Sequence, residues 1–187
     1  MKVRCPKCKY VNSVDKGVID FHCASCSSLL TTLKNKEKIR CPKCKKINYA
    51  AKPRHFEEGT RTSEDAANQL GCDISHIAKS IVFCGEKGAI IVITSGSNRV
   101  DRKKKLKKIL GYKPGQASPG YVLENTGYAI GGVPPFGHLK HTEIIMDEDL
   151  FNYKLIWGAS GTADTVFPIT PEELQEISGA SVKDVKQ

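Results

Sequence analysis

The stretch HIAKSIVFCGEKGAIIVITSG, residues 76–96, decides the fold class that we expect for this chain. Two runs of β-branched and other apolar residues flank a turn from Gly85 to Gly88, a pattern typical of a β-hairpin. A lysine, Lys79, stands immediately before the first apolar run, where a core residue would be usual. Such a lysine can carry its ammonium to water while its stem covers the core, so its position alone assigns it no function.

Helices and further strands surround this hairpin in the sequence. Thr62 can cap a helix with Asp65 three residues later, and Gly71 ends that helix. A second short helix begins at Asp101, and residues 170–178 form a capped terminal helix. Further strands are predicted at residues 127–132, 143–147, 155–160 and 165–169. Because turns separate these strands more often than long helices do, we expect an α+β fold, with a mixed, curved β-sheet or barrel-like core and helices packed outside it.

The basic charge is concentrated at the N-terminal end of the chain. The whole chain has 187 residues, 40% of them apolar, and a net charge of +9. Residues 1–52 hold 13 Lys and Arg against three acidic residues, a net of +10, whereas residues 53–187 hold 16 basic and 17 acidic residues. We therefore expect a small basic domain over residues 1–50 and a larger domain over residues 53–187.

The sequence shows no signal for a membrane or for secretion. No window approaches the roughly 18 apolar residues of a membrane span. The start, MKVRCPKCKY, lacks the apolar centre of a secretion signal. We therefore expect a cytoplasmic protein with no membrane partner.

Six cysteines form three evenly spaced pairs in the basic domain. Two residues separate the members of each pair, and 14 residues separate one pair from the next. This spacing is typical of zinc ribbons, in which two pairs fill a tetrahedral Zn²⁺ site. The candidate ligands of this structural zinc are Cys5, Cys8, Cys23, Cys26, Cys41 and Cys44. Disulfides and a redox pair are the alternatives. Disulfides suit a reducing compartment less well, and a thioredoxin-like redox pair would be expected beside a strand–helix unit that is missing here.

The spacing leaves open which two pairs bind the metal. The segments FHCASCSSLL and IRCPKCKKIN resemble small phage-type and bacterial zinc ribbons, which favours the second and third pairs. The first pair is similar to the third, so the first and second pairs are a nearly equal alternative. The remaining pair could recruit His22, His55 or a second chain.

Lysines around the cysteine pairs make the basic domain a candidate for RNA binding. Their charge suits phosphates, and a site filled by four thiolates has no open position for a substrate, so we expect binding rather than catalysis. The alternative is that the basic domain only makes the protein more soluble.

The helix that begins at Asp101 is also basic, with six Lys and Arg residues within 102–108. These residues either form a face in contact with water or contact phosphates.

Five motifs follow one another over residues 53–187, and they are RTSEDAANQLG, ISHIAKSIVF, VITSGSNRVDRKKKLKKILG, ENTGYAIGGVPPFGH and LIWGASGTADTVFPITPEEL. In this order and spacing they resemble the YbaK/prolyl-tRNA-synthetase-associated family. Free-standing or inserted domains of that family hydrolyse mischarged aminoacyl-tRNA. The resemblance therefore implies both a YbaK-like fold and an ester hydrolase.

The resemblance also implies roles for four candidate catalytic residues. Lys79 matches the family's essential lysine, which lies near the ester carbonyl and the terminal adenosine of the tRNA. The loop GGVPPFG is similar to the family's Gly-Gly-x-x-Pro-x-Gly loop. By this resemblance, Gly131, Gly132 and Gly137 bring backbone N–H groups close to the same carbonyl.

The candidate substrate-binding residues come from several segments of the larger domain. The segment GASGT is similar to a small-residue loop on the opposite wall of the family's pocket. The candidates are His55, Thr60, Ser80, Pro135, His138, Ala159, Ser160, Gly161 and Asp164. His138 could act as an acid or base, although an isolated histidine is more often a surface or hydrogen-bonding residue.

Two departures from the family pattern affect which aminoacyl group would fit the pocket. Val133 and Pro134 stand where many relatives have a small polar residue before the proline. Asp164 is only the nearest candidate for an acidic residue that some members carry after the small-residue loop.

An aminoacyl ester is already activated, so its hydrolysis needs a placed water and stabilisation of the tetrahedral oxyanion rather than a strong nucleophile. Cys72 and Cys84 lack a histidine partner in a motif, no GxSxG elbow is present, and no His/Glu spacing indicates a catalytic metal. We therefore expect Lys79 to orient and stabilise the ester, and no cofactor for catalysis.

Together these features predict a trans-editing aminoacyl-tRNA deacylase that serves translation fidelity, with the zinc ribbon assisting RNA binding. The expected partners are tRNA and an aminoacyl-tRNA synthetase. The alternative is an inactive RNA- or protein-binding module on the same fold. A DNA-binding regulator is a weaker third hypothesis, because it would leave the pocket motifs without a use.

Overall fold

The computed structural model of this chain describes residues 53–57 and 62–187, and the backbone of six short strands within the first 50 residues. These strands form three antiparallel pairs. They are β1 (Lys2–Arg4), β2 (Val11–Ser13), β3 (Ile19–Cys23), β4 (Ser28–Thr32), β5 (Ile39–Arg40) and β6 (Ile47–Asn48). The predicted zinc ligands lie outside the described residues, apart from the backbone of Cys23, and Thr60 lies outside them too. The zinc ribbon and its ligand set therefore stay predictions.

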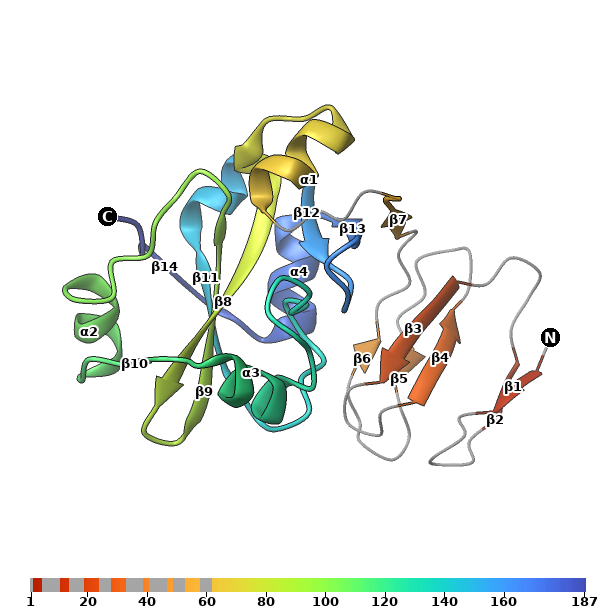
Figure 1. The fold of residues 1–187 in the computed structure, drawn as a ribbon, viewed down its shortest axis with the longest axis horizontal. Helices are drawn as coiled ribbons and strands as arrows, with labels where there is room; N and C mark the ends of the chain where they lie inside the picture. The colour runs from red at the N-terminus through yellow and green to blue at the C-terminus, as the bar shows by residue number, and fades with distance from the viewer. Residues whose placement is uncertain are drawn as a thin grey trace.

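A mixed sheet of eight strands organises the chain from Arg54 onward (Figure 1). In spatial order its strands are β14 (Ser181–Lys183), β11 (Glu143–Asp147), β9 (Gly88–Ser95), β8 (Ile77–Gly85), β12 (Ile156–Ala159), β13 (Thr165–Ile169) and β7 (Arg54–His55), and β10 (Gly115–Gln116) also pairs with β8. The hairpin predicted from residues 76–96 is confirmed, because β8 and β9 pair antiparallel from Ala78 to Gly85. β11 runs parallel to β9 and β12 runs parallel to β8, so the predicted mixed sheet is also confirmed. Among the described strands, β14 and β7 end the sheet without pairing with each other, so it is open rather than closed into a barrel.

Four α-helices and two 3₁₀-helices lie around this sheet in the described part of the chain. They are α1 (Ser63–Leu70), η1 (Ile74–His76), α2 (Lys105–Leu110), α3 (Pro119–Thr126), η2 (Glu148–Asn152) and α4 (Pro171–Ser178). The predicted ends of α1 are confirmed. The Thr62 hydroxyl accepts the N–H of Asp65, the Asp65 carboxylate accepts the N–H of Thr62, and Gly71 ends the helix at a φ of +67°. Thr170 and Glu173 cap α4 in the same way.

Side chains pack against both faces of the sheet. On one face, η2 and α4 add Leu150 and Leu174 to a core that has these sheet residues: Ala78, Ile91, Ile93, Met146, Ile156, Phe167 and Ile169. On the other face, α2 and the C-terminal Val185 cover Phe83, Ile90, Val92 and Ile145. The apolar residues of α2 in this second core are Leu106, Ile109 and Leu110. Because it is covered on both faces, β9 is buried from Ala89 to Ser95, as its continuous apolar sequence suggests.

Two sequence predictions of secondary structure are wrong. Residues 127–132 form no strand, because Gly127 ends α3 at a φ of +83° and a turn follows it. The signals for α3 itself are visible in the sequence: Ser118 caps it and Pro119 is its first residue. The second helix begins at Lys105 rather than at Asp101, whose carboxylate accepts the N–H groups of Lys103 and Lys104.

A membrane-crossing helix is absent from the described residues, since none of their helices combines the necessary length with the necessary apolar character.

Replacing a core residue of β12 tests the importance of this packing. Ile156 is 0% exposed whereas its neighbour Leu155 is 42% exposed. We expect Ile156→Ala to lower the free energy of unfolding by about 2–5 kcal/mol, because it leaves a cavity in the core. Leu155→Ala, the matched control, should cost less than about 1 kcal/mol. Urea unfolding followed by fluorescence of Trp157, the single tryptophan of the chain, measures both, and equal losses would contradict the packing described.

Candidate functional site

A gap in the sheet lies beside β8. β9 occupies one edge of β8 along its length, so β12 and β10 must share the other edge. β12 pairs only with Ile77 and Ala78, and β10 pairs only with Phe83 and Cys84. Residues 79–82 therefore have no strand partner on this edge among the described residues.

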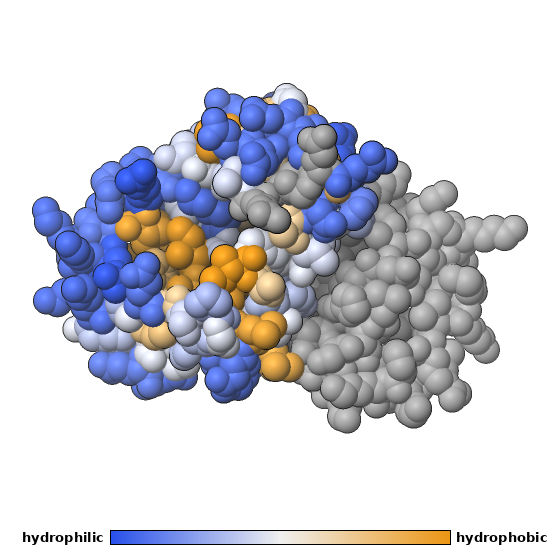
Figure 2. All heavy atoms as spheres, viewed as in Figure 1, coloured by the Kyte–Doolittle hydropathy of each residue, from blue (hydrophilic) through white to orange (hydrophobic). Residues whose placement is uncertain are grey.

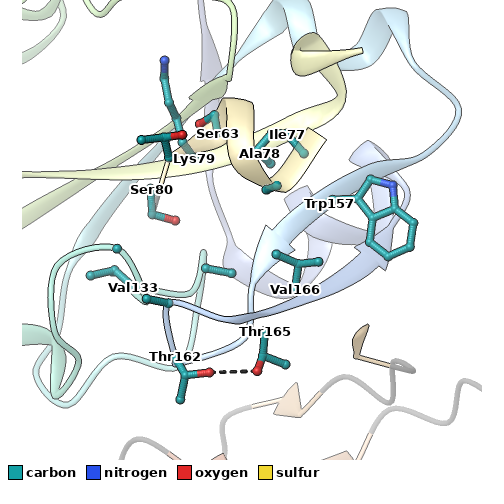
Figure 3. Close-up of a pocket in the computed structure, with 15 residues that line it drawn as sticks. Ser63, Ile77, Ala78, Lys79, Ser80, Val133, Trp157, Thr162, Thr165 and Val166 are labelled. Carbon is teal, nitrogen blue, oxygen red and sulfur yellow. Dashed lines mark hydrogen bonds between the residues drawn. The ribbon is translucent and has the colours of Figure 1, made fainter. Parts of the chain in front are cut away.

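A cavity of about 300 Å³ opens next to this unpaired edge (Figure 3). Its walls come from the start of α1, from β8, from the loop after α3, and from β12, β13 and the turn between them. Among the predicted site residues, Lys79, Ser80, Gly131 and Ala159 line it. The remaining wall residues are small, apolar or hydroxyl-bearing: Thr62, Ser63, Ala66, Ile77, Ala78, Val133, Trp157, Thr162, Ala163, Thr165 and Val166.

Lys79 and Ser80 leave β8 on opposite sides (Figure 3). The Lys79 ammonium points away from Val133 and donates a hydrogen bond of 2.9 Å to the carbonyl oxygen of Gly96. Burial lowers the pKa of Lys79 below its usual range, and the positive charge of Arg99 lowers it further. Thus Lys79 lines the cavity, but its charge is held on the side away from the Gly131–Gly132 loop.

Ser80 supplies a polar atom on the other side of the strand. Its Oγ is buried and has no hydrogen-bond partner within the described part of the chain. An adjoining cavity of about 290 Å³ shares Ser80, Gly131 and Val133 with the first. A buried hydroxyl between two cavities can bond a ligand that enters either of them.

Close backbone contacts hold the glycine loop against the neighbouring turn. A Cβ on Gly132 would lie 2.9 Å from the backbone of Thr162, and a Cβ on Gly161 would lie 3.1 Å from the Tyr128 ring. Gly137 has a φ of +83°, a conformation that favours glycine. The predicted loops GGVPPFG and GASGT are therefore in direct contact, although Gly132, Gly137 and Gly161 are not on the cavity wall.

The structure keeps His138 outside the cavity. Its side chain is 1% exposed, and Nε2 lies 2.8 Å from the carbonyl oxygen of Pro134, which can only accept, so Nε2 carries the proton. Nδ1 lies 3.0 Å from the hydroxyl of Thr142. These two bonds tie the loop that contains Pro135 to the strand that follows, which is a structural role.

Asp164 and His55 also lie away from the cavity wall. The Asp164 carboxylate accepts the hydroxyl of Thr165 at 3.2 Å and lies 3.6 Å from Nδ1 of His55. A hydrogen bond from Thr162 is the main cause that holds the pKa of Asp164 below its usual range. Ser160 donates its N–H to the carbonyl of Thr165, which closes the turn between β12 and β13.

Sequence reasoning missed the wall made by α1 and Trp157. The capping signal of Thr62 predicted where α1 begins, but it could not show that this end faces β8. Trp157 lies beneath the Arg54 guanidinium, whose central carbon is 5.1 Å from the ring centroid, a cation–π contact. A lone tryptophan in a predicted strand carries no signal for such a position.

The described residues offer no obvious metal site in this region. No group of three or more His, Cys, Asp or Glu side chains within residues 53–57 and 62–187 is placed to hold an ion. The residues that line the cavity supply hydroxyls, backbone groups and the side chain of Lys79, whose ammonium contacts the Gly96 carbonyl.

Comparison with known proteins defines the class of this domain. Residues 57–177 match the model of the aminoacyl-tRNA editing domain. The chain belongs to this family, and the YbaK-like resemblance expected from the five motifs is thereby confirmed.

Individual relatives agree with this assignment. A solved structure described as "a putative trans-editing enzyme for prolyl tRNA synthetase" has 43% sequence identity and a TM-score of 0.70, over 73% of this chain and 87% of that one. "Uncharacterized protein YwhH" of Bacillus subtilis is 38% identical over 68% of this chain and 81% of its own length. "Putative Cys-tRNA(Pro)/Cys-tRNA(Cys) deacylase EbsC" of Enterococcus faecalis is 26% identical over 70% of this chain and 80% of its own length.

A single methyl group on the glycine loop tests its contact with the neighbouring turn. We expect Gly132→Ala to destabilise the protein by about 1–3 kcal/mol, because its Cβ would overlap the Thr162 backbone. Gly120→Ala is the matched control, since Gly120 lies within α3 and has nothing within 4 Å of an added Cβ. That control should be neutral or stabilising by up to about 1 kcal/mol. Urea unfolding compares the two, and a neutral Gly132→Ala would argue against the contact.

Proposed function

We propose that this protein hydrolyses the ester bond of mischarged aminoacyl-tRNA and acts in trans as an editing deacylase. The observation that supports it most directly is the meeting of Lys79, Ser80 and Gly131 at one cavity beside the unpaired edge of β8. Membership of the aminoacyl-tRNA editing family and the names of two relatives point to the same reaction.

The proposed reaction needs only groups that the cavity offers. A water oxygen adds to the ester carbonyl carbon, and the carbonyl oxygen becomes an oxyanion. The backbone N–H of Gly131 and the Ser80 hydroxyl would stabilise that oxyanion. The Lys79 ammonium would add positive charge there after leaving the Gly96 carbonyl and turning into the cavity. The carbon–oxygen bond to the ribose then breaks with its electron pair on the ribose oxygen. That oxygen takes up the proton that the attacking water lost, passed on by the neighbouring ribose hydroxyl or by a second water, and the amino acid leaves with a free carboxyl group.

The size of the cavity limits what can enter it. A volume of about 300 Å³ accommodates an aminoacyl group but not the body of a tRNA, which must remain on the surface. Trp157 and several small side chains form the wall that would select the amino acid. The names of the two relatives refer to prolyl-tRNA synthetase and to tRNA(Pro), so mischarged tRNA(Pro) is the first substrate to test.

Removing the lysine tests the proposal. We expect the full chain to deacylate at least one member of a panel of mischarged tRNAs, and Lys79→Ala to lower that rate by about 100-fold, as loss of a transition-state contact does. Lys87→Ala is the matched control, because this exposed lysine lies at the opposite end of the same hairpin. Release of the radiolabelled amino acid measures the rate.

Two outcomes would contradict the deacylase. One is no hydrolysis above buffer for any mischarged tRNA, and the other is equal rates for Lys79→Ala and wild type. Tight tRNA binding without hydrolysis would instead support the alternative of an inactive binding module.

We further propose that the tRNA body contacts the surface of α2. Seven basic residues and no acidic residue lie between 102 and 123 in the sequence. Of these, Lys105 forms an ion pair with Asp184, whereas no ion pair is found for Lys103, Lys104, Lys107 or Lys108 within the described residues. Figure 2 shows this end of the molecule as strongly hydrophilic beside an apolar area. Unpaired lysines on α2 and in the turn directly before it suit the phosphate backbone of a nucleic acid.

Neutralising two of these lysines tests the proposed RNA contact. Lys104→Gln together with Lys108→Gln should weaken tRNA binding and reduce the slope of log K against log salt by about 1.5, because each lost phosphate contact reduces it by about 0.7–0.9. The control pair is Lys87→Gln with Lys154→Gln, which removes equal charge from exposed sites elsewhere. Binding measured from 50 to 200 mM salt gives both slopes, and equal slopes for the two double variants would rule out the contact.

We make three further proposals for a protein with this deacylase function. The first 50 residues would bind zinc and assist RNA binding, and an aminoacyl-tRNA synthetase would be a further partner. A cytoplasmic location would suit that substrate.

A further inference from the structure

A fully buried carboxylate lies next to the strand pair that carries Lys79. Asp147, the last residue of β11, is 0% exposed. Its Oδ2 accepts hydrogen bonds from the Thr94 hydroxyl at 2.6 Å and from the Asn98 amide at 2.8 Å. A buried charge held by several donors is costly to maintain, so its role merits a physical explanation.

The first of these bonds connects Asp147 to the strand position opposite Lys79. Thr94 of β9 is the register partner of Lys79 in the antiparallel hairpin. Side chains of directly opposed residues project from the same face of a sheet. The carboxylate that binds the Thr94 hydroxyl therefore lies on the same face as the Lys79 stem.

The second bond connects Asp147 to the loop that holds the ammonium. Asn98 donates its backbone N–H to the carbonyl of Ser95, and Gly96 between them accepts the Lys79 ammonium. Gly96 in turn donates its N–H to the carbonyl of Ile77 at 2.7 Å.

The position of Gly96 itself leaves little freedom. A Cβ on Gly96 would lie 2.2 Å from the carbonyl oxygen of Ile74, so only glycine fits here. The acceptor of the Lys79 ammonium is thus a fixed part of the backbone, and Asn98, two residues further along the same loop, donates its side-chain amide to Asp147.

We propose that Asp147 is a positioning residue for Lys79. Through Thr94 and Asn98 it holds the strand end and the loop that place the ammonium, and its negative charge stabilises that ammonium. The placement of Lys79 follows from the contacts described above. The consequence for catalysis rests on the proposed deacylase.

The charges around Lys79 determine the direction of the expected effects. Asp149, which also accepts a hydrogen bond from the Asn98 amide, is paired with Lys186 at 2.8 Å. Two charges therefore act on the pKa of Lys79 in opposite directions: Asp147 favours the ammonium, and Arg99 disfavours it. Removing the first charge should lower the pKa of Lys79, and removing the second should raise it.

The experiment compares Asp147→Asn with Arg99→Gln in the full chain. The pH dependence of Lys79 acetylation by acetic anhydride, read by peptide mass spectrometry, gives the pKa of this amine without any need for deacylase activity. We expect a lower pKa in Asp147→Asn, a higher pKa in Arg99→Gln, and no change in the control Asp184→Asn, whose carboxylate pairs with Lys105 on the surface.

Deacylation supplies a second measurement. The alkaline limb of the rate should move to lower pH in Asp147→Asn and to higher pH in Arg99→Gln, because an ammonium is lost as pH rises through its pKa. At pH 8 we expect about a tenfold lower kcat for Asp147→Asn, with KM changed less than about twofold.

The outcomes separate the two proposals. An unchanged Lys79 pKa in folded Asp147→Asn would overturn the positioning role, whereas a shifted pKa in a protein that deacylates no tRNA would retain it and reject the proposed function. If Asp147→Asn does not fold, Asn98→Ala tests the positioning role instead. This variant keeps the Asp147 carboxylate but removes the hydrogen bond that connects it to the loop of Gly96. Faster acetylation of Lys79 in that variant supports the proposal, and an unchanged rate overturns it.

Discussion

The site depends on how β8 uses its two edges. β9 pairs with one edge from Ala78 to Gly85, so the other edge has to serve both β12 and β10. Neither of these short strands reaches residues 79–82, and a sheet that is otherwise continuous has a gap there. The cavity, its hydroxyls and the glycine loop all lie along this gap. A longer β12 or β10 would pair with the free edge and leave no room for the cavity.

Glycine makes the two closest backbone contacts around the site possible. Gly132 approaches Thr162, and Gly96 approaches Ile74, at distances where any Cβ would overlap backbone atoms. The first contact positions the loop on one side of β8, and the second positions the carbonyl that holds the Lys79 ammonium on the other. Polar groups are thus available on both sides of one strand, with the hydroxyl of Ser80 facing the loop.

The elements with strong local signals were predictable from the sequence. The hairpin of β8 and β9 and the capped helices α1 and α4 follow from alternation, turn glycines and capping pairs, which act over a few residues. The strand predicted at residues 127–132 was wrong because its glycines serve turns after α3, whose Ser-Pro start had been visible. Of the candidate site residues, Lys79, Ser80, Gly131 and Ala159 line the cavity, whereas His138 and Asp164 are bonded elsewhere.

By itself, the sequence determined that a lysine stands directly before the apolar run of a hairpin strand, and that two glycine-containing loops follow in a fixed order. The strand itself begins two residues before that lysine, at Ile77. It also determined the family, because the motifs keep their order and spacing along residues 53–187. Only the tertiary structure decided which face of β8 each side chain occupies, that α1 and Trp157 close the cavity, and that Asp147 lies beside the strand opposite Lys79. The physical reason is distance along the chain. Hydrogen bonds such as that between Thr94 and Asp147 join residues 53 positions apart, and no local pattern of residue types specifies such a pair.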